Sequence, residues 1–232
     1  MRTEDIDQVW TLPLLSTMAE QNLSTLLQGA FLQRFPVHVE LIREGEPADF
    51  LHVIVDGQVE LYARYRGRET TITVLNSPSC FILAAVMLDR PYLKSARVLS
   101  PSRILLIPVE SVRSMFTIDN AFARAITQEL SFAFRGLVKE LKNQKLRSTI
   151  ERLAAWLVRF NSEHGLNNEI VLPFDKKVLA SRLGMVPEVL SRTFVNLKDY
   201  GVRVEGPRII IGDLQALQKL ALPDDLIDDP AS

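Results

Sequence analysis

The segment 175–200 constrains the fold more than any other part of the chain, because it reads as two short helices joined by a glycine. Apolar residues at helical spacing mark both helices: Leu179, Ala180 and Leu183 in the first, and Met185, Leu190 and Phe194 in the second. Gly184 lies between them and ends the first. Two helices joined in this way form a helix-turn-helix, whose second helix can enter the major groove of DNA. Any two amphipathic helices around a glycine share this pattern. The neighbouring residues are therefore needed to distinguish a DNA-binding motif from an ordinary helix pair.

Three polar residues point outward near the N-terminal end of the second predicted helix: Glu188, Ser191 and Arg192. Arg can bind guanine O6 and N7 with two parallel hydrogen bonds, Glu can accept from the cytosine amino group, and Ser adapts to several bases. These three residues are therefore predicted to read bases. The alternative is that one of them contacts only phosphate.

The residues after the second helix favour the DNA-binding interpretation. The runs VRVE and RIIIGD flank Gly206-Pro207 and predict two short strands, the wing that often supports such a helix. Basic residues in or beside this region are candidates for phosphate contacts: Lys176, Lys177, Arg182, Lys198 and Arg203. Ordinary solvated charges are the alternative for each of these.

Length and composition limit the classes of protein to which the chain can belong. The 232 residues, 47% of them hydrophobic, suffice for two domains with real cores, and the net charge of −1 is not that of a non-specific nucleic-acid binder. A single cysteine, Cys80, excludes a disulfide framework and a four-thiolate site within one chain. No apolar stretch approaches the length of a membrane span, so a cytoplasmic protein is expected.

A long helix is predicted from about Asp119 to Lys145. Its apolar stripe repeats at spacings of four and three: Phe122, Ile126, Leu130, Ala133, Leu137 and Leu141. Such a stripe favours a partner helix, and therefore a homodimer. Burial of the helix inside one monomer is the alternative.

Residues 1–118 contain short β-type runs separated by turn signals, after a short predicted helix over Glu20–Phe31. Asp56-Gly57 lies between the runs 50–55 and 58–62 and predicts a hairpin, because Asp-Gly is a strong two-residue turn signal. Further strands are expected over 70–75, 96–99 and 104–107. Together these runs predict an antiparallel barrel or roll.

The predicted fold class is α+β. The expected order is an antiparallel β-roll that serves as sensor domain over 1–118, a dimerisation helix and hinge over 119–147, and a winged helix-turn-helix over 148–223. Residues 224–232 contain four aspartates and Pro230, and Pro223 directly precedes them. This segment is expected to be an acidic, disordered tail.

Three segments together resemble the Crp/Fnr family of bacterial transcription regulators. REGEPADFLHVIVDGQVELY is similar to the family's β-roll, and RGLVKELKNQKLRSTIERLAAWLV to its dimerisation helix and hinge. VLASRLGMVPEVLSRTFVNLKDYGV followed by RIIIGD is similar to its winged helix-turn-helix. The segments occur in the family's order, and the resemblance runs from about Leu12 to Leu222.

The resemblance implies an effector-binding roll like a cyclic nucleotide-binding domain, a helix that pairs two subunits, and binding to palindromic promoter DNA. Glu188-Val-Leu-Ser191-Arg192 resembles the E-x-x-S-R of the Fnr subgroup. That subgroup implies half-sites like TTGAT, with Arg192 on the guanine. RNA polymerase would be a further partner if the protein activates transcription.

The effector region departs from the family's cyclic-nucleotide pattern. Leu83-Ala84 stands where a Gly-Glu pair is expected, and Lys94-Ser95 where the family has Arg-Ser. Leucine cannot bind a ribose hydroxyl, and lysine lacks the two-pronged grip of arginine on phosphate. Binding of cAMP is therefore not expected. The apolar run 81–88 fits a filled core or a pocket for an apolar ligand.

The histidines and the cysteine are the candidates for other sensing chemistries. An iron–sulfur cluster is not expected, because no cysteine precedes Cys80. A haem that senses nitric oxide or carbon monoxide stays open, with His52 as the candidate ligand ahead of His38 and His164. A core or rim histidine with a hydrogen bond is the alternative for His52, and an inert half-buried thiol is the alternative to a redox role for Cys80.

No enzyme is indicated. The chain has no glycine-rich phosphate loop, no H-E-x-x-H and no G-x-S-x-G. The rival from another class is a ligand-binding β-roll that acts through a protein partner and lacks a DNA-reading helix.

Overall fold

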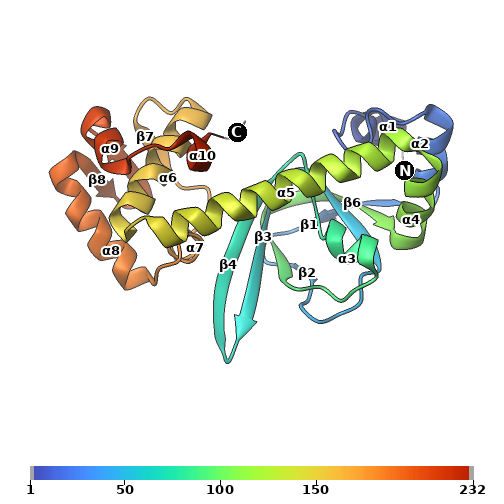
Figure 1. The fold of residues 1–232 in the computed structure, drawn as a ribbon, viewed down its shortest axis with the longest axis horizontal. Helices are drawn as coiled ribbons and strands as arrows, with labels where there is room; N and C mark the ends of the chain where they lie inside the picture. Colours follow the sequence, from blue (N-terminus) through green and yellow to red (C-terminus); the bar gives the residue numbers. More distant parts are fainter. Residues whose placement is uncertain (1–2, 230–232) are drawn as a thin grey trace. The chain divides into compact units, whose positions relative to one another are not determined.

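The computed structural model describes residues 3–229 of the chain. It divides into two compact units, Met1–Ala133 and Phe134–Ser232, each with its own hydrophobic core (Figure 1). The predicted class, α+β with an N-terminal antiparallel roll and a C-terminal winged helix-turn-helix, is confirmed. Within the described residues, no helix combines the length and the hydropathy of a membrane span.

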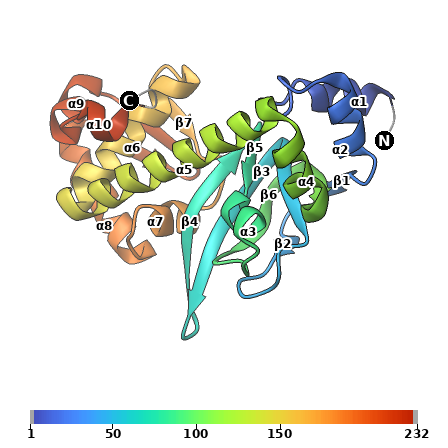
Figure 2. The ribbon, with the colours of Figure 1, turned by 45° about the vertical axis from the view of Figure 1, so that its right-hand side comes forward.

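An antiparallel sheet forms the body of the first unit (Figure 2). Its strands are β1 (Phe31–Phe35), β2 (Glu40–Ile42), β3 (Phe50–Tyr65), β4 (Arg68–Asn76), β5 (Ser79–Phe81) and β6 (Ser95–Pro108). The order β1-β6-β3-β4 forms the main path, with β2 paired to β6 and β5 paired to β3. Alternate residues of β3 and β6 point to opposite faces, so both faces of this pair contribute to the core.

Asp56-Gly57 does not form the predicted hairpin. Strand β3 continues through it, and the register against β6 shifts on both sides of Asp56, as at a β-bulge. Gly57 has φ +96°, and a Cβ there would lie 2.2 Å from Oγ of Ser102 and 2.7 Å from the backbone oxygen of Pro101. The glycine is therefore explained by the close approach of β6, a long-range contact that the local pattern did not reveal.

The actual hairpin lies ten residues later. Tyr65 pairs with Arg68, which leaves Arg66 and Gly67 as a two-residue loop between β3 and β4. Both residues have positive φ, 49° and 76°, as a type I′ turn requires. The two strands expected over 96–99 and 104–107 are likewise one strand, β6, because β3 is long enough to pair with both.

Helices cover the sheet of the first unit. They are α1 (Thr3–Trp10), α2 (Glu20–Leu27), α3 (Leu83–Leu88), α4 (Val109–Ile118) and the first half of α5 (Asn120–Leu146). Helix α2 ends earlier than predicted, because Phe31 pairs with Leu106 as the first residue of β1. Part of the apolar run 81–88 lies in the core, including Leu83 and Val86, whereas Leu88 is 69% exposed.

Asp119 fixes the corner between α4 and α5. Its Oδ1 accepts hydrogen bonds from the amides of Ala121 and Phe122, each at 2.9 Å, and its Oδ2 accepts from Nδ2 of Asn22 at 2.8 Å. Burial opposes ionisation of this carboxyl, but the hydrogen bonds from Asn22 and the amides hold its pKa below the usual range. The start of α5 is thereby tied to α2.

Helix α5 uses its apolar stripe in two ways. Phe122 and Ile126 are fully buried in the core of the first unit, which fits the alternative of burial within one monomer for this half. Leu137 and Leu141 are 59% and 54% exposed. Three apolar residues outside the predicted stripe are also exposed: Phe132, Phe134 and Val138. We call Phe134, Leu137, Val138 and Leu141, which recur at spacings of three and four, the exposed α5 face.

The second unit packs helices against a three-stranded sheet. Its helices are α6 (Thr149–His164), α7 (Lys176–Arg182), α8 (Pro187–Asn196), the 3-10 turn η1 (Leu197–Tyr200), α9 (Leu214–Ala221) and α10 (Asp225–Asp228). Its strands are β7 (Glu169–Val171), β8 (Val202–Glu205) and β9 (Arg208–Ile211), in the order β7-β9-β8. Strands β8 and β9 are the two predicted wing strands, and β7 adds a third.

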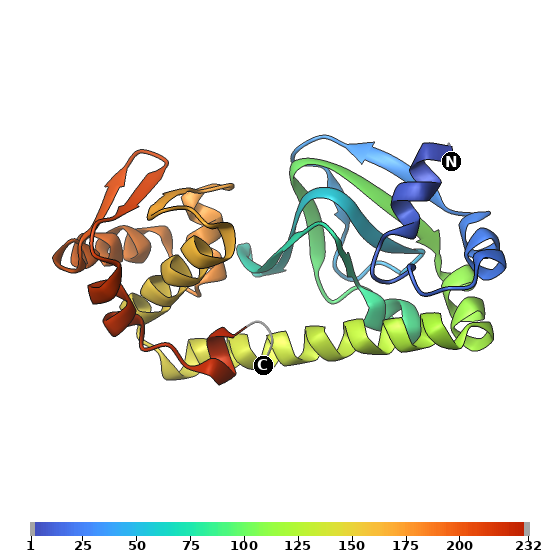
Figure 3. The same ribbon diagram turned by 90° about the horizontal axis from the view of Figure 1, so that it is seen from above.

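The expectation of a disordered tail is wrong for residues 224–229. Helix α10 lies against the C-terminal part of α5, with Ile227 buried (Figure 3). Nη1 and Nη2 of Arg147 donate to the two carboxylate oxygens of Asp228 at 2.8 and 2.5 Å. The few apolar residues of this segment predicted disorder. The bidentate ion pair between Arg147 and Asp228 instead connects the segment to the end of α5. Residues 230–232 of the expected tail lie outside the described residues.

Candidate nucleic-acid interface

Helices α7 and α8 pack through the apolar residues that the sequence singled out. Leu179 and Ala180 of α7 are fully buried, and Leu190 and Phe194 of α8 are 2% and 7% exposed. Leu183 and Met185, on either side of the turn, belong to the same core. Pro187 occupies the first turn of α8, where its fixed φ suits a helix start and its missing N–H costs nothing.

The turn between the helices depends on Gly184. Its φ is +67°, in the left-handed region, and its amide donates to the backbone oxygen of Ser181 at 3.0 Å. The nearest atom to a Cβ placed there, in the side chain of Gln144, would be 3.7 Å away. Backbone conformation, and not lack of space, therefore favours glycine at this position.

Glu188, Ser191 and Arg192, the three predicted base-reading residues, lie on the exposed side of α8. We call them the α8 polar row. Glu188 lies in the first turn and Arg192 one turn later, and within residues 3–229 no ion pair joins them. Their side chains are therefore not committed to one another.

Two hydroxyl residues on α8 show which side of the helix is available. Thr193 is 4% exposed and donates to the backbone oxygen of Val189, so its hydroxyl is used inside the protein. Ser191 is exposed and donates to the backbone oxygen of Pro187 at 3.0 Å. While this bond is made, the oxygen of Ser191 can still accept a hydrogen bond from outside.

The five predicted phosphate contacts differ in exposure. Lys177, Lys198 and Arg203 are exposed. Lys176 is partly exposed, and its Nζ donates to the backbone oxygen of Gly206 at 2.8 Å, which ties the start of α7 to the wing turn. Arg182 is also only partly exposed, and burial, with Arg159 nearby, lowers the pKa of its guanidinium. Arg182 is therefore the least suited of the five to an outside partner.

Arg152 was not predicted from the sequence to have a role, but it connects α6 to the turn of the helix-turn-helix. It is 8% exposed, and its Nε donates to the backbone oxygen of Leu183 at 2.9 Å. Its Nη1 donates to the backbone oxygen of Arg147 at 2.7 Å. One side chain thus joins the end of α5, α6 and the turn before α8. An arginine among the apolar residues of RLAAWLV was the available signal.

Comparison with known proteins agrees with this geometry. Residues 32–119 match the cyclic nucleotide-binding domain, and residues 151–220 match the Crp-like helix-turn-helix domain. The chain belongs to the Crp/Fnr family. As a Crp/Fnr protein it is a transcription regulator with a helix-turn-helix DNA-binding domain. This domain removes the alternative of a β-roll without a DNA-reading helix.

Similar proteins cover most of the chain. A CRP-like cAMP-activated global transcriptional regulator of Mycobacterium tuberculosis is 22% identical over 193 residues, which cover 81% of this chain and 86% of that protein. A structure from Silicibacter pomeroyi, assigned as a cAMP-binding regulatory protein, is 28% identical with a TM-score of 0.60, covering 94% of this chain and all of that one. A structure from Eubacterium rectale assigned to the Crp/Fnr family has a TM-score of 0.76 at 18% identity, with 91% and 98% covered.

The residues at the cyclic-nucleotide positions of this Crp/Fnr protein offer little to a nucleotide. Leu83 is buried in the core, and Ala84 is exposed but has no polar group. Ser95 is 1% exposed, and its hydroxyl accepts from the amide of Glu44 at 3.0 Å. Lys94 is partly exposed, and burial lowers the pKa of its amine. The amine of Lys94 is thus the single cationic group that these four residues could offer to a phosphate.

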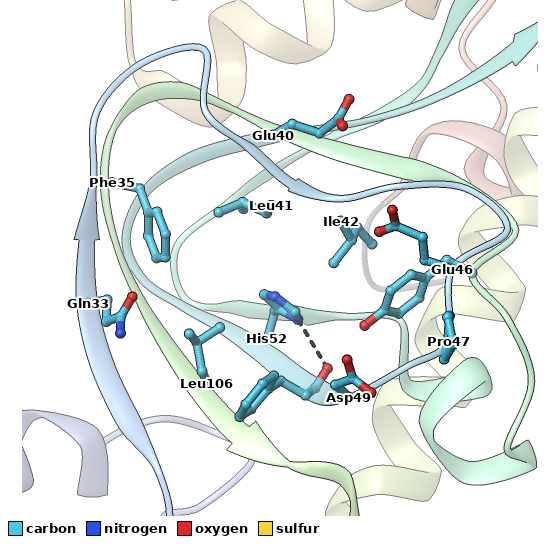
Figure 4. Close-up of a pocket in the computed structure, with 12 residues that line it drawn as sticks. Gln33, Phe35, Glu40, Leu41, Ile42, Glu46, Pro47, Asp49, His52 and Leu106 are labelled. Carbon is cyan, nitrogen blue, oxygen red and sulfur yellow. Dashed lines mark hydrogen bonds between the residues drawn. The ribbon is translucent and has the colours of Figure 1, made fainter.

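His52, the haem candidate, lies in β3 and lines a cavity of about 400 Å³ (Figure 4). Three carboxylates also line this cavity, those of Glu40, Glu46 and Asp49, and among the described residues of its lining there is no lysine or arginine. The two propionates of a haem would meet these negative charges without a basic partner. The residues around His52 therefore do not fit a haem.

Cys80 lies in β5, where it pairs with Val53 of β3. Burial raises the pKa of its thiol well above the usual range, and the carboxylate of Glu129, with an oxygen 3.8 Å from Sγ, acts in the same direction. A thiol that stays protonated is a poor nucleophile. This environment fits the inert alternative.

Proposed function

We propose that the protein binds palindromic promoter DNA as a homodimer and reads half-sites like TTGAT with the α8 polar row. The observation that carries this proposal is the pairing of an exposed row, Glu188, Ser191 and Arg192, with a buried opposite face on the same helix. A rigid helix that presents Arg, Glu and Ser side chains outward suits recognition of base edges in the major groove. Lys177, Lys198 and Arg203 would neutralise phosphates.

The homodimer is supported by the exposed α5 face. Phe134, Leu137, Val138 and Leu141 are between 42% and 67% exposed, so apolar side chains lie in contact with solvent along one side of the helix. Pairing of two such helices would also bring two recognition helices together, as a palindromic site requires. The protein would act in the cytoplasm, where promoter DNA lies, and on RNA polymerase if it is an activator.

The controlling signal is proposed to be something other than cAMP, although the relative from Mycobacterium tuberculosis is named as cAMP-activated. Leu83 and Ala84 offer no hydrogen-bonding side chain, and Ser95 already accepts a bond from Glu44. A ribose-phosphate would lose its hydration here without matching partners. Calorimetric titration with cAMP should show no binding at micromolar concentrations.

A gel-shift experiment tests the DNA proposal. Wild-type protein should bind a TTGAT palindrome better than a scrambled duplex, with affinity that falls as salt rises. Arg192→Ala should weaken binding to the palindrome by about 1–3 kcal/mol and affect scrambled DNA far less. Lys219→Ala removes an exposed positive charge on α9, outside the helix-turn-helix, and is the matched control.

Two results would contradict the proposal. Equal binding of palindromic and scrambled duplexes by the wild type would remove sequence recognition. Equal losses on both duplexes for Arg192→Ala would limit this side chain to the DNA backbone.

A further inference from the structure

The cavity beside His52 is a ligand site candidate separate from the cyclic-nucleotide positions. Neither Leu83, Ala84, Lys94 nor Ser95 lines it. Its walls come from β1, β2, the start of β3, the segment that leads into β3 and Leu106 of β6 (Figure 4). Tyr92 also lines it. A volume of about 400 Å³ lies within the range of small-molecule sites.

His52 directs an unused acceptor into this cavity. The side chain is 5% exposed, its ring stacks on Phe81 with centroids 5.0 Å apart, and its Nδ1 donates to the backbone oxygen of Phe50 at 3.1 Å. Burial lowers the pKa of His52 to about 4, so the imidazole is neutral near pH 7 and Nε2 keeps its lone pair.

Nε2 of His52 has no hydrogen-bond partner within residues 3–229. In the same residues, no side-chain nitrogen or oxygen that is fully shielded from solvent lacks a partner. Nε2 is therefore not fully shielded, and the cavity that His52 lines is the space it can reach. An unpaired acceptor such as Nε2, on a side chain that is otherwise buried, suits a ligand that donates a hydrogen bond.

The charged groups at the cavity are acidic and differ in what they already bind. Glu40 is satisfied by the protein, since it accepts from the hydroxyl of Tyr62 at 2.6 Å and from Nε of Arg43 at 2.9 Å. Glu46 is exposed and has only a distant ion pair, 3.7 Å from Arg43. Asp49 is exposed and forms no ion pair with any residue in 3–229. Two carboxylates are thus available for a cation.

The rest of the lining is largely apolar. Phe35, Leu41, Ile42 and Leu106 contribute hydrocarbon surface around His52 (Figure 4). Such surface favours an aromatic or aliphatic body on the ligand. The combination of an apolar wall, a neutral acceptor and two exposed carboxylates disfavours an anionic ligand on electrostatic grounds.

We propose that this cavity binds a small arylalkylamine, whose ring hydroxyl or ring N–H donates to Nε2 of His52 and whose ammonium faces Glu46 and Asp49. The ring would lie between the apolar walls. The proposal goes beyond DNA recognition and can be tested without DNA, so its failure would leave the proposed promoter binding untouched.

Calorimetric titration of the full chain with three matched probes tests the proposal. Tyramine carries both the ring hydroxyl and the ammonium, phenethylamine lacks the hydroxyl, and 3-(4-hydroxyphenyl)propionate replaces the ammonium by a carboxylate. Tyramine should bind about tenfold more tightly than phenethylamine, the effect of one hydrogen bond to a buried acceptor. The propionate should not bind.

Variants locate the binding. In His52→Phe the tenfold preference for tyramine over phenethylamine should disappear, with folding checked by circular dichroism. Because that substitution alters a buried residue, Glu46→Gln together with Asp49→Asn provides an independent test at exposed positions. This pair should weaken tyramine at least about tenfold, as loss of two nearby charges predicts. Glu110→Gln, an exposed acid at the start of α4, is the matched control and should change nothing.

Three outcomes would overturn the proposal. The first is no heat of binding for tyramine up to millimolar concentration. The second is equal binding of tyramine and the propionate. The third is unchanged tyramine affinity in the Glu46→Gln, Asp49→Asn protein.

Discussion

Nε of Arg152 donates a hydrogen bond to the backbone oxygen of Leu183 at 2.9 Å, which connects α6 to the turn of the helix-turn-helix. The same guanidinium donates to the backbone oxygen of Arg147, just after α5. The turn that positions α8 is thus held by a buried side chain from the preceding helix. Arg152 does not touch the α8 polar row, so it can affect DNA binding only by positioning.

Arg152→Met should lower the free energy of unfolding of the second unit by about 2–4 kcal/mol, because carbonyls of Leu183 and Arg147 lose a buried partner. Urea unfolding followed by the fluorescence of Trp156, in a Trp10→Phe background, reports this unit. Arg159→Met is the matched control on α6, since its pair with Glu163 is 3.8 Å long and partly exposed. Equal losses for both variants would refute a special role for Arg152.

Gly184→Ala should destabilise the second unit by about 1–2 kcal/mol, because alanine is disfavoured at a φ of +67° although space is available. Gly136→Ala should have the opposite sign, with a gain of about 0.5–1 kcal/mol, because Gly136 lies inside α5 with nothing near its Cβ position. Both are read from urea unfolding at one protein concentration. A neutral effect of Gly184→Ala would contradict the conformational argument.

Local periodicity predicted the second unit well. Buried Leu179, Leu190 and Phe194 follow helical spacing, and Gly206-Pro207 ends one wing strand and precedes the next. These features depend on contacts between residues close in sequence. Strand β7 was missed because three residues are too few to show a pattern.

Long-range contacts explain what the sequence did not reveal. Gly57 belongs to a bulge because β6 passes close to it, and Phe122 is buried because α5 packs on its own β-roll before it leaves that unit. The cavity at His52 brings together β1, β2 and β3, which no short segment encodes. The α8 polar row could be predicted because all of its members lie on one helix.

Asp228→Asn should release α10 from α5 and cost about 1–3 kcal/mol at neutral pH, because it breaks a bidentate ion pair. Burial opposes ionisation of Asp228, but hydrogen bonds from Arg147 hold its pKa below the usual value of 3.8. The contribution is therefore complete above the pKa of the unfolded chain and is lost as pH falls through the lower, folded-state pKa.

The pH dependence of this pair gives its own measurement. The difference in unfolding free energy between wild type and Asp228→Asn should be constant from pH 5.5 to 7.5 and shrink below about pH 4. Asp225→Asn, one helical turn earlier in α10, is the comparison variant. A difference that grows as the pH falls would reverse the sign and refute the assignment.

Cys80 should react with iodoacetamide at pH 8 at least about 100-fold more slowly in the folded protein than in urea, because its thiol is buried and protonated. Mass spectrometry of the alkylated chain measures both rates. Glu129→Gln removes the nearby negative charge and should speed the folded-state reaction only slightly, since burial is the larger cause. Rapid alkylation of the folded wild type would show that the Cys80 thiol is accessible and reactive, which would favour a redox role.

The two halves of α5 should respond differently to substitution. Phe122→Ala should destabilise the first unit by about 3–5 kcal/mol, because it opens a cavity in a fully buried core. Leu137→Glu should leave the monomer folded, because this side chain is 59% exposed, but should prevent pairing of the exposed α5 face. Light scattering after gel filtration gives the oligomeric state, and urea unfolding gives the stability. A Leu137→Glu protein that remained dimeric and bound the palindrome normally would show that this face does not pair the subunits.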